Sequence, residues 1–171
     1  MTPPQNTQYH TEKAVRYMAE ESKKFPVRKH PRLPHYDYTT ANYYFVTICT
    51  HKKVCLFGDS TTLSPIGKIA EELLLKVPDH FPGIEIDKYV IMPNHIHAMI
   101  ILPGGTVELP TIVGQYKGAV TKAIHKEAPN ICLWQTSFHD HIVRNQADYE
   151  RIWTYIDGNP SKWLEDCFYV P

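Results

Sequence analysis

The sequence has 171 residues, 43% of them hydrophobic, and a formal net charge of zero. This length suits one domain, because domains usually hold ~100–200 residues, and the apolar content excludes wholesale disorder. No apolar run reaches the ~18 residues that a membrane-spanning helix needs, and the N-terminus lacks the pattern of a secretory signal. Four cysteines, none in a C-x-x-C pair, indicate reduced thiols rather than a disulfide or zinc scaffold. We therefore expect an intracellular protein.

Charge is distributed unevenly along the chain. Residues 1–36 carry seven Lys and Arg against three Glu, a net charge of +4, so the remainder carries −4. We interpret residues 1–36 as a basic N-terminal arm and linker, and residues 37–171 as a single globular domain. A basic arm on a mildly acidic body suggests a polyanionic partner, and a solvated tail explains the arm equally well.

The hydrophobic pattern of the globular part predicts alternating strands and helices. The strands are dense in β-branched and aromatic residues, and the helices repeat apolar residues at spacings of three and four. The predicted elements are a strand at 43–51, a helix at 65–77, paired strands at 84–92 and 95–102, a helix at 111–126, a short strand at 131–138 and a helix at 146–158. This order predicts an α+β fold, a ferredoxin-like split βαβ sandwich in which an antiparallel sheet carries helices on one face.

His95 and His97 flank Ile96 in the strand that follows a predicted turn. Alternate side chains share one face of a strand, so both imidazoles point the same way, with their Cα atoms ~6–7 Å apart. Two imidazoles at this spacing can converge on one divalent metal ion. Two unrelated histidines on a polar sheet face would give the same pattern, so the pair alone only suggests a metal site.

Tyr155 is a candidate for chemistry because of its place on the last predicted helix. At ~100° per residue it lies ~110° from the middle of the apolar stripe of that helix. Asn159 follows one turn later on the same side, where Asp148 and Arg151 also lie, and its amide oxygen suits a hard cation. From geometry alone, an ordinary half-exposed tyrosine beside a helix-ending asparagine is the simpler interpretation.

A second His-x-His pair, His139 and His141, lies close to Arg144. These side chains suit contact with a phosphate or with the surroundings of a metal ion. A polar surface loop is the simpler interpretation of the same residues.

Taken together, the segments resemble the HUH single-tyrosine transposases, specifically the branch associated with repetitive extragenic palindromes. The resemblance runs from about Tyr36 to Trp163 and is most specific in Met-Pro-Asn-His-Ile-His at 92–97 and Tyr-Ile-Asp-Gly-Asn-Pro at 155–160. The stretches that carry it are 44–50, 90–98, 114–122, 134–145 and 149–160.

The resemblance implies a role for each matching residue. His95 and His97 would hold Mg²⁺ or Mn²⁺, Asn159 would complete the metal site, and Tyr155 would be the catalytic nucleophile. The implied activity is that of a metal-dependent single-stranded DNA endonuclease and transposase, which forms a 5′-phosphotyrosine intermediate and rejoins strands at hairpins of repetitive extragenic palindromes. Such a protein would be cytoplasmic and nucleoid-associated in a prokaryote, and a homodimer is compatible with the family.

The expected DNA contacts are basic residues, since Lys and Arg neutralise backbone phosphates. They lie in the arm, on the helix at 111–126 and before the last helix: Arg28, Lys29, Arg32, Lys117, Lys122, Lys126 and Arg144.

Two alternatives stay open. A non-catalytic single-stranded nucleic-acid-binding domain would need neither metal nor Tyr155. A zinc-dependent phosphodiesterase would place His95, His97, His139 and His141 around zinc and an activated water, with no covalent intermediate. Metal preference distinguishes the transposase from the phosphodiesterase. Use of Mg²⁺ or Mn²⁺ suits a His/His/Asn site, whereas tight binding of zinc favours the hydrolase.

Overall fold

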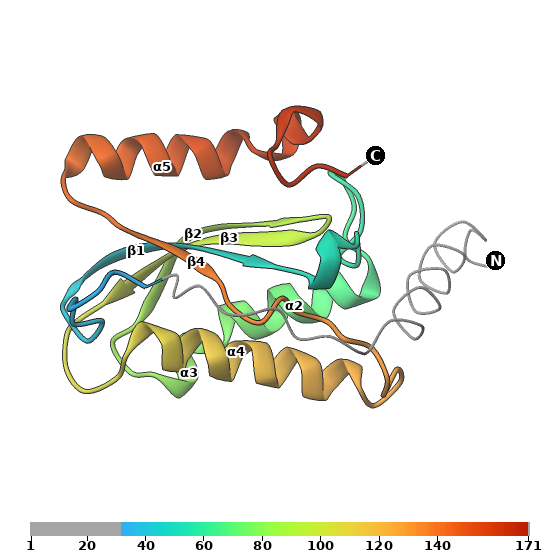
Figure 1. Cartoon of the computed structure of the whole chain (residues 1–171), viewed down its shortest axis with the longest axis horizontal. Coiled ribbons are helices and arrows are strands. Elements are labelled where there is room, and N and C mark those ends of the chain that lie inside the picture. Colours follow the sequence, from blue (N-terminus) through green and yellow to red (C-terminus); the bar gives the residue numbers. More distant parts are fainter. Residues whose placement is uncertain (1–31, 171) are drawn as a thin grey trace.

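The computed structural model describes residues 32–170, which form a four-stranded antiparallel sheet with helices on both sides (Figure 1). The strand order is β2-β3-β1-β4, which is the order of a split βαβ sandwich. The predicted α+β fold is therefore confirmed. The elements are β1 (Asn42–Cys49), η1 (His51–Lys53), α2 (Pro65–Leu75), α3 (Val77–His80), β2 (Glu85–Met92), β3 (His95–Leu102), α4 (Leu109–Ile124), β4 (His139–Ile142), α5 (Gln146–Gly158) and η2 (Pro160–Glu165).

Strand β3 lies in the middle of the sheet and fixes the register of its neighbours. It pairs with β1 on one side and β2 on the other, so that His95 lies between Cys49 and Met92, and His97 lies opposite Thr47 on β1. Because side chains alternate between the two faces, each residue of β3 belongs to one face only.

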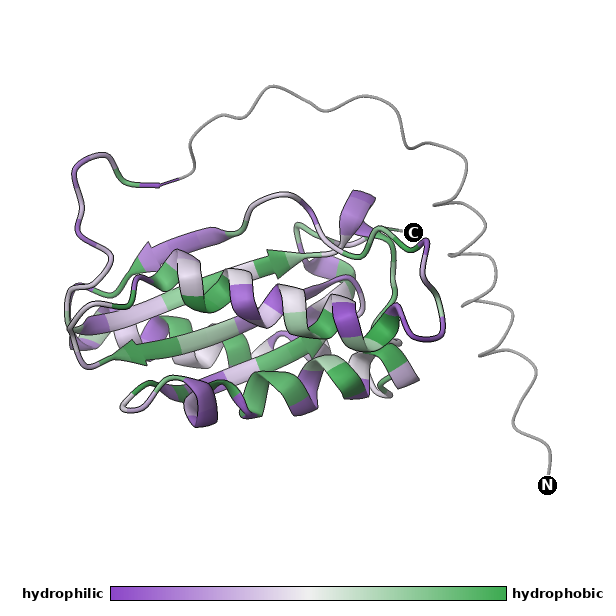
Figure 2. Cartoon of the chain, turned by 90° about the horizontal axis from the view of Figure 1, so that it is seen from below, coloured by the Kyte–Doolittle hydropathy of each residue, from purple (hydrophilic) through white to green (hydrophobic). Residues whose placement is uncertain are grey.

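Helices α2 and α4 cover one face of the sheet and enclose the main core. The β3 residues on this face are apolar, and all are nearly inaccessible to solvent. In Figure 2 apolar and polar positions alternate along the helices of this face, as expected of helices with one buried side. Ser64 caps the start of helix α2, because its side chain accepts a hydrogen bond from the Gly67 amide. Helix α4 buries Leu109, Ile112, Val113, Tyr116, Val120 and Ile124.

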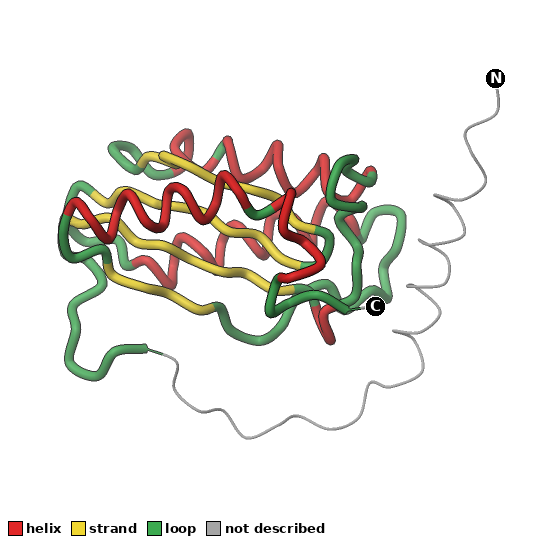
Figure 3. The backbone as a smooth tube through the Cα atoms, turned by 90° about the horizontal axis from the view of Figure 1, so that it is seen from above, coloured by secondary structure: helices red, strands yellow, loops and turns green. Residues whose placement is uncertain are grey.

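Helix α5 lies on the opposite face of the sheet (Figures 1 and 3), so the prediction that all helices share one face was wrong. A small second core joins α5 to this face and contains Met99, Val143, Ile152 and Ile156. The strand β3 offers apolar side chains to both faces, and Met99 provides a contact for α5 that the order of elements does not reveal. The helix packs on β2 and β3 and leaves the β4 edge less covered (Figure 3).

The fourth strand lies at His139–Ile142 and not at the predicted 131–138. The predicted stretch makes only an isolated bridge, between Trp134 and Thr50 just after β1, while Ile131, Leu133 and Phe138 fill the main core. Its apolar character therefore reflects burial of a loop. The His139–Ile142 segment pairs with β1 at the edge of the sheet. It can be polar because an edge strand has one side open to solvent.

The described part of the N-terminal arm is tied to the sheet. The guanidinium of Arg32 forms an ion pair with Asp140 of β4 and lies 3.5 Å over the Phe138 ring, and the Tyr38 hydroxyl donates to the same carboxylate. Arg32 thus has an intramolecular partner, which argues against its predicted role in DNA binding. Arg28 and Lys29 lie outside the described residues. Within residues 32–170 no helix is long and apolar enough to cross a membrane.

Candidate active site

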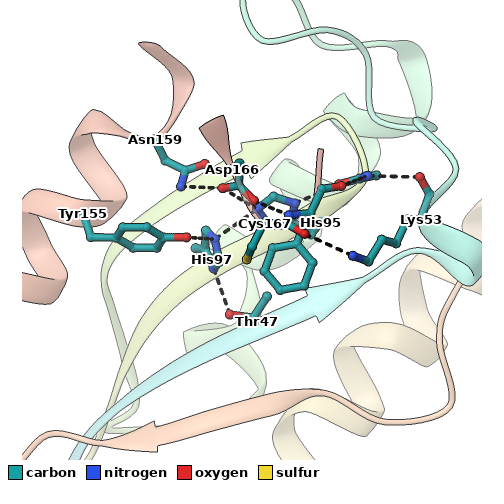
Figure 4. Close-up of polar contacts among 10 residues, drawn as sticks. Thr47, Lys53, His95, His97, Tyr155, Asn159, Asp166 and Cys167 are labelled. Carbon is teal, nitrogen blue, oxygen red and sulfur yellow. Dashed lines mark hydrogen bonds and ion pairs between the residues drawn. The ribbon is translucent and has the colours of Figure 1, made fainter. Parts of the chain in front are cut away.

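The two histidines of β3 meet on the face that α5 covers (Figure 4). His95 and His97 are 0% and 1% exposed, and their Nε2 atoms lie 3.0 Å apart. Ile96 points into the main core between α2 and α4. The predicted alternation of this strand is confirmed, and it places two imidazoles against each other inside the protein.

Neighbouring side chains fix the orientation of both rings. The Asn94 amide nitrogen donates to the backbone carbonyls of Lys53 and Phe168, so its oxygen faces His95 Nδ1 at 2.8 Å. His95 Nδ1 must therefore carry the proton, which leaves Nε2 with a free lone pair. The Thr47 hydroxyl lies 2.9 Å from His97 Nδ1 and fixes the orientation of that ring. Such outer partners are the usual means of aiming a histidine at a metal ion.

Burial keeps both imidazoles neutral. It lowers the pKa of His95 to about 4 and the pKa of His97 well below its ordinary value, where the neighbouring His95 adds to the effect. A neutral imidazole is the form that binds metal, so the pair is in its ligating form at neutral pH.

Tyr155 projects from α5 toward the histidine pair. Its hydroxyl lies 3.2 Å from His97 Nε2, and its ring packs edge-on against Phe45 with 6.1 Å between centroids. The residue is 41% exposed, as its predicted place outside the apolar stripe requires. Burial of the hydroxyl, reinforced by the negative charge of Asp166, raises the pKa of Tyr155 to about 12. The phenol is therefore protonated at neutral pH, and part of the side chain is open to solvent.

Asp166 is a third candidate ligand that sequence reasoning did not find. His95, His97 and Asp166 offer ligand atoms that all lie within 4.8 Å of one another. The Asp166 side chain is only 2% exposed, and its Oδ2 lies 3.9 Å from His95 Nε2. It reaches the site because η2 turns the chain back toward β3, where the Phe168 ring packs 4.6 Å from the His95 ring.

Asn159 lies at the same site, as predicted. Its side-chain nitrogen donates to Asp166 Oδ2 at 2.9 Å. Its Oδ1 is buried and has no hydrogen-bond partner among residues 32–170. Two imidazoles, a carboxylate and an unpartnered amide oxygen form a donor set that suits Mg²⁺ or Mn²⁺, so the residues fit a divalent cation.

The structure separates the second histidine pair from this cluster. His139 and His141 lie on β4 at the edge of the sheet, where His139 is exposed and His141 bonds Asp148 at 2.7 Å between Nε2 and Oδ2. Neither belongs to the group of possible metal ligands among the described residues. The prediction of a polar loop at these residues was wrong, and so is the four-histidine arrangement of the zinc alternative.

The predicted DNA-binding residues fall in two places. Lys117, Lys122 and Lys126 line an open groove of about 600 Å³ on α4, beside Trp134 and on the far side of the sheet from Tyr155. Arg144 lies just before α5 on the side of Tyr155. Among the predicted DNA-binding residues that the structure describes, Arg144 alone lies toward the histidine face.

Thr47 and Asn94 are further candidate site residues that the sequence analysis did not single out. Asn94 was part of the recognised motif, and its position next to His95 was a usable signal. Thr47 lies on another strand, so only the register of β1 against β3 reveals its contact with His97. No sequence pattern pointed to Asp166, because helical periodicity stops near Gly158 and the path of the chain beyond it is irregular.

Comparison with known proteins identifies the class. Residues 37–159 match the family described as IS200-like transposases, a span that includes His95, His97, Tyr155 and Asn159 but not Asp166. The chain therefore belongs to the IS200-like transposase family. The prediction of a transposase that uses a tyrosine nucleophile is confirmed at the level of the family.

Individual relatives agree with this assignment. An uncharacterized protein of Haemophilus influenzae is 32% identical over 168 aligned residues, which span 84% of this chain and 93% of the relative. The REP-associated tyrosine transposase of Escherichia coli is 32% identical over 94 residues, which span 54% of each chain. A solved structure of a REP-associated tyrosine transposase bound to a REP hairpin matches with a TM-score of 0.61 at 24% identity, covering 81% of this chain and 74% of the other. These relatives point to the branch that the motifs indicated, and the structural match supports the fold.

Proposed function

We propose that the protein is a metal-dependent single-stranded DNA endonuclease and transposase in which Tyr155 is the nucleophile. The observation that carries the proposal is the 3.2 Å distance between the Tyr155 hydroxyl and His97 Nε2, within a buried cluster of possible metal ligands. A phosphate held at this cluster would lie next to the tyrosine oxygen. Attack on phosphorus requires this proximity of the nucleophile.

The chemistry follows from the groups around the hydroxyl. The Tyr155 oxygen forms a bond to phosphorus, the bond from phosphorus to the 3′-oxygen breaks, and the 3′-oxygen takes up a proton. The phenol must lose its own proton during attack, because its pKa is raised to about 12. The product is a 5′-phosphotyrosine and a free 3′-hydroxyl, and the phosphotyrosine ester keeps the strand ready for rejoining.

We propose that His95, His97 and Asp166 hold Mg²⁺ or Mn²⁺, with the Asn159 amide oxygen as a further ligand. When bound, such an ion neutralises charge on the phosphate and orients it. Asn94 and Thr47 hold the two imidazoles toward that position. Asn159 holds Asp166 in place through its side-chain nitrogen.

The proposed substrate is single-stranded DNA that carries a hairpin. A structural relative has been solved with a REP hairpin, and this chain has a basic groove suited to phosphates. Lys117, Lys122, His125 and Lys126 line that groove, and no acidic residue among 32–170 does. We propose that it binds the hairpin stem through backbone phosphates. A protein with this substrate would act at the nucleoid.

A covalent-trapping experiment tests the nucleophile. The probe is a pool of single strands with a palindromic stem and randomised flanks, labelled at the 3′ end because the protein retains the strand on the 3′ side of the break. Wild-type protein with Mn²⁺ should give a shifted band on a denaturing gel. Tyr155→Phe and His95→Ala should lose it by several orders of magnitude.

Two controls make the result specific. Tyr149→Phe removes a hydroxyl from the same helix, one that donates to Asp87, and should keep the adduct. The same pool labelled at its 5′ end should be shortened without a shift. Cleavage that persists in Tyr155→Phe with no adduct would overturn the nucleophile assignment and favour hydrolysis by water. DNA binding with neither cleavage nor adduct would favour the non-catalytic binder.

A further inference from the structure

A second hollow lies beside α5, toward the helix start from Tyr155. It has a volume of about 370 Å³ and is lined by His141, Arg144, Asn145, Ala147, Asp148 and Arg151. Arg151 precedes Tyr155 by one helical turn on the same side of α5, which is ~6 Å along the axis. That separation is comparable to the span of one nucleotide in an extended strand.

Asp148 organises the charges around this hollow. Its carboxylate accepts hydrogen bonds from His141 Nε2 at 2.7 Å and from an Arg151 guanidinium nitrogen at 2.6 Å. These bonds, that of His141 first, lower the pKa of Asp148 to about 2. The carboxylate is therefore ionised and holds both partners at the rim of the hollow.

Arg144 supplies positive charge that no described residue neutralises. Its side chain is exposed and forms no ion pair among residues 32–170. Because Asp148 balances only one of the two guanidinium groups, the hollow keeps a net positive charge. A guanidinium in this position suits a phosphate, which it can bind through two parallel hydrogen bonds.

The floor of the hollow continues to the nucleophile. His141 lies directly across from Phe45 in the β1–β4 pair, and the Phe45 ring in turn contacts the Tyr155 ring. Since α5 packs on β2 and β3, this aromatic strip near the β4 edge is only partly covered. Aromatic rings beside a basic groove are the usual means of holding single-stranded bases.

Resting on the proposed function, we propose that this hollow binds the nucleotide next to the scissile phosphate on the same DNA strand. Arg144 and Arg151 contact the phosphate of that nucleotide. His141 and Phe45 contact its base. The pocket thus holds the strand on one side of the bond that Tyr155 attacks.

The test measures binding without cleavage, in the Tyr155→Phe background. The probe is fluorescently labelled oligo(dT), and its affinity is measured over a range of salt concentrations. Arg144→Ala should weaken binding several-fold and make the slope of log affinity against log salt less steep by about 1, because one phosphate contact is lost. Lys68→Ala, which removes an exposed charge from α2 on the other side of the sheet, should leave the slope unchanged.

Arg144→Lys separates charge from structure, because lysine keeps the charge and should keep most of the slope. An unchanged slope in Arg144→Ala would overturn the proposal. A slope in Arg144→Lys that is reduced as much as in Arg144→Ala would also overturn it. The outcome is independent of the trapping experiment, since Tyr155 does not react here. If Tyr155 were not the nucleophile, the adduct would fail while these slopes remained as expected.

Discussion

The two faces of the sheet share the same strands but differ in how they are covered. Helices α2 and α4 enclose one face and bury an apolar core that includes Ile96, Ala98 and Ile100. On the other face the single helix α5 buries only a small cluster around Met99 and leaves Tyr155 at 41% exposed. Because neighbouring residues of β3 point to opposite faces, one strand both anchors the fold and presents the histidines.

This difference shows that the enclosed face of the sheet supports the site on the other face. The backbone of His95 and His97 is held by ladders on both sides and by the core below, so the strand itself fixes the positions of the two rings. Under the proposed function, the half-covered face would leave room for a DNA strand beside Tyr155. Substitutions on the two faces should therefore have separable effects on stability and on activity.

The largest expected effect on stability is that of Ile96→Ala, on the enclosed face. Ile96 is fully buried, so the change should lower the free energy of unfolding by ~2–5 kcal/mol through lost contacts and a cavity. The adduct yield per folded molecule should change little. Chemical denaturation followed by trapping at low temperature checks both. A stability loss below that of an exposed-site change such as Leu75→Ala would contradict this account of the core.

A middle-sized effect is expected for Thr47→Val, on the histidine face. The change keeps the shape but removes the hydroxyl that holds His97 Nδ1 at 2.9 Å. We expect Mn²⁺ affinity to fall by about 10–100-fold, as for other losses of a partner that orients a metal ligand. Calorimetric titration with Mn²⁺ measures it. Thr121→Val removes a hydroxyl on α4 and serves as the matched control, and equal affinities in the two variants would remove Thr47 from the site.

The smallest effect concerns Lys117, on the outer side of α4. Burial lowers the pKa of Lys117 to about 8, so its ammonium group loses charge as the pH rises through that value. Affinity for the labelled hairpin pool should therefore fall a few-fold between about pH 7 and about pH 9, and a bound phosphate would move this window upward. Lys117→Arg should remove this part of the decline, because a guanidinium stays charged. The same decline in both proteins would show that Lys117 does not contact the DNA.

Several features could be predicted from the sequence because they depend on local pattern. Alternation placed His95 and His97 on one face and Ile96 on the other, and helical periodicity placed Tyr155 and Asn159 on one side of α5. The order of elements predicted the α+β fold and the pairing of β2 with β3. These properties follow from the side-chain periods of about two residues in a strand and about 3.6 residues in a helix, which are local features of the sequence.

Other features depend on contacts between distant segments, and only the tertiary structure decided them. The side of the sheet on which α5 lies depends on packing against Met99, and the pairing of β4 depends on an open edge of β1 rather than on its own polar residues. Thr47 reaches His97 through the register of two strands, and Asp166 reaches His95 through an irregular return of the chain after η2. A local pattern sets which way a side chain points, whereas the partner it meets is set by the packing of the whole chain.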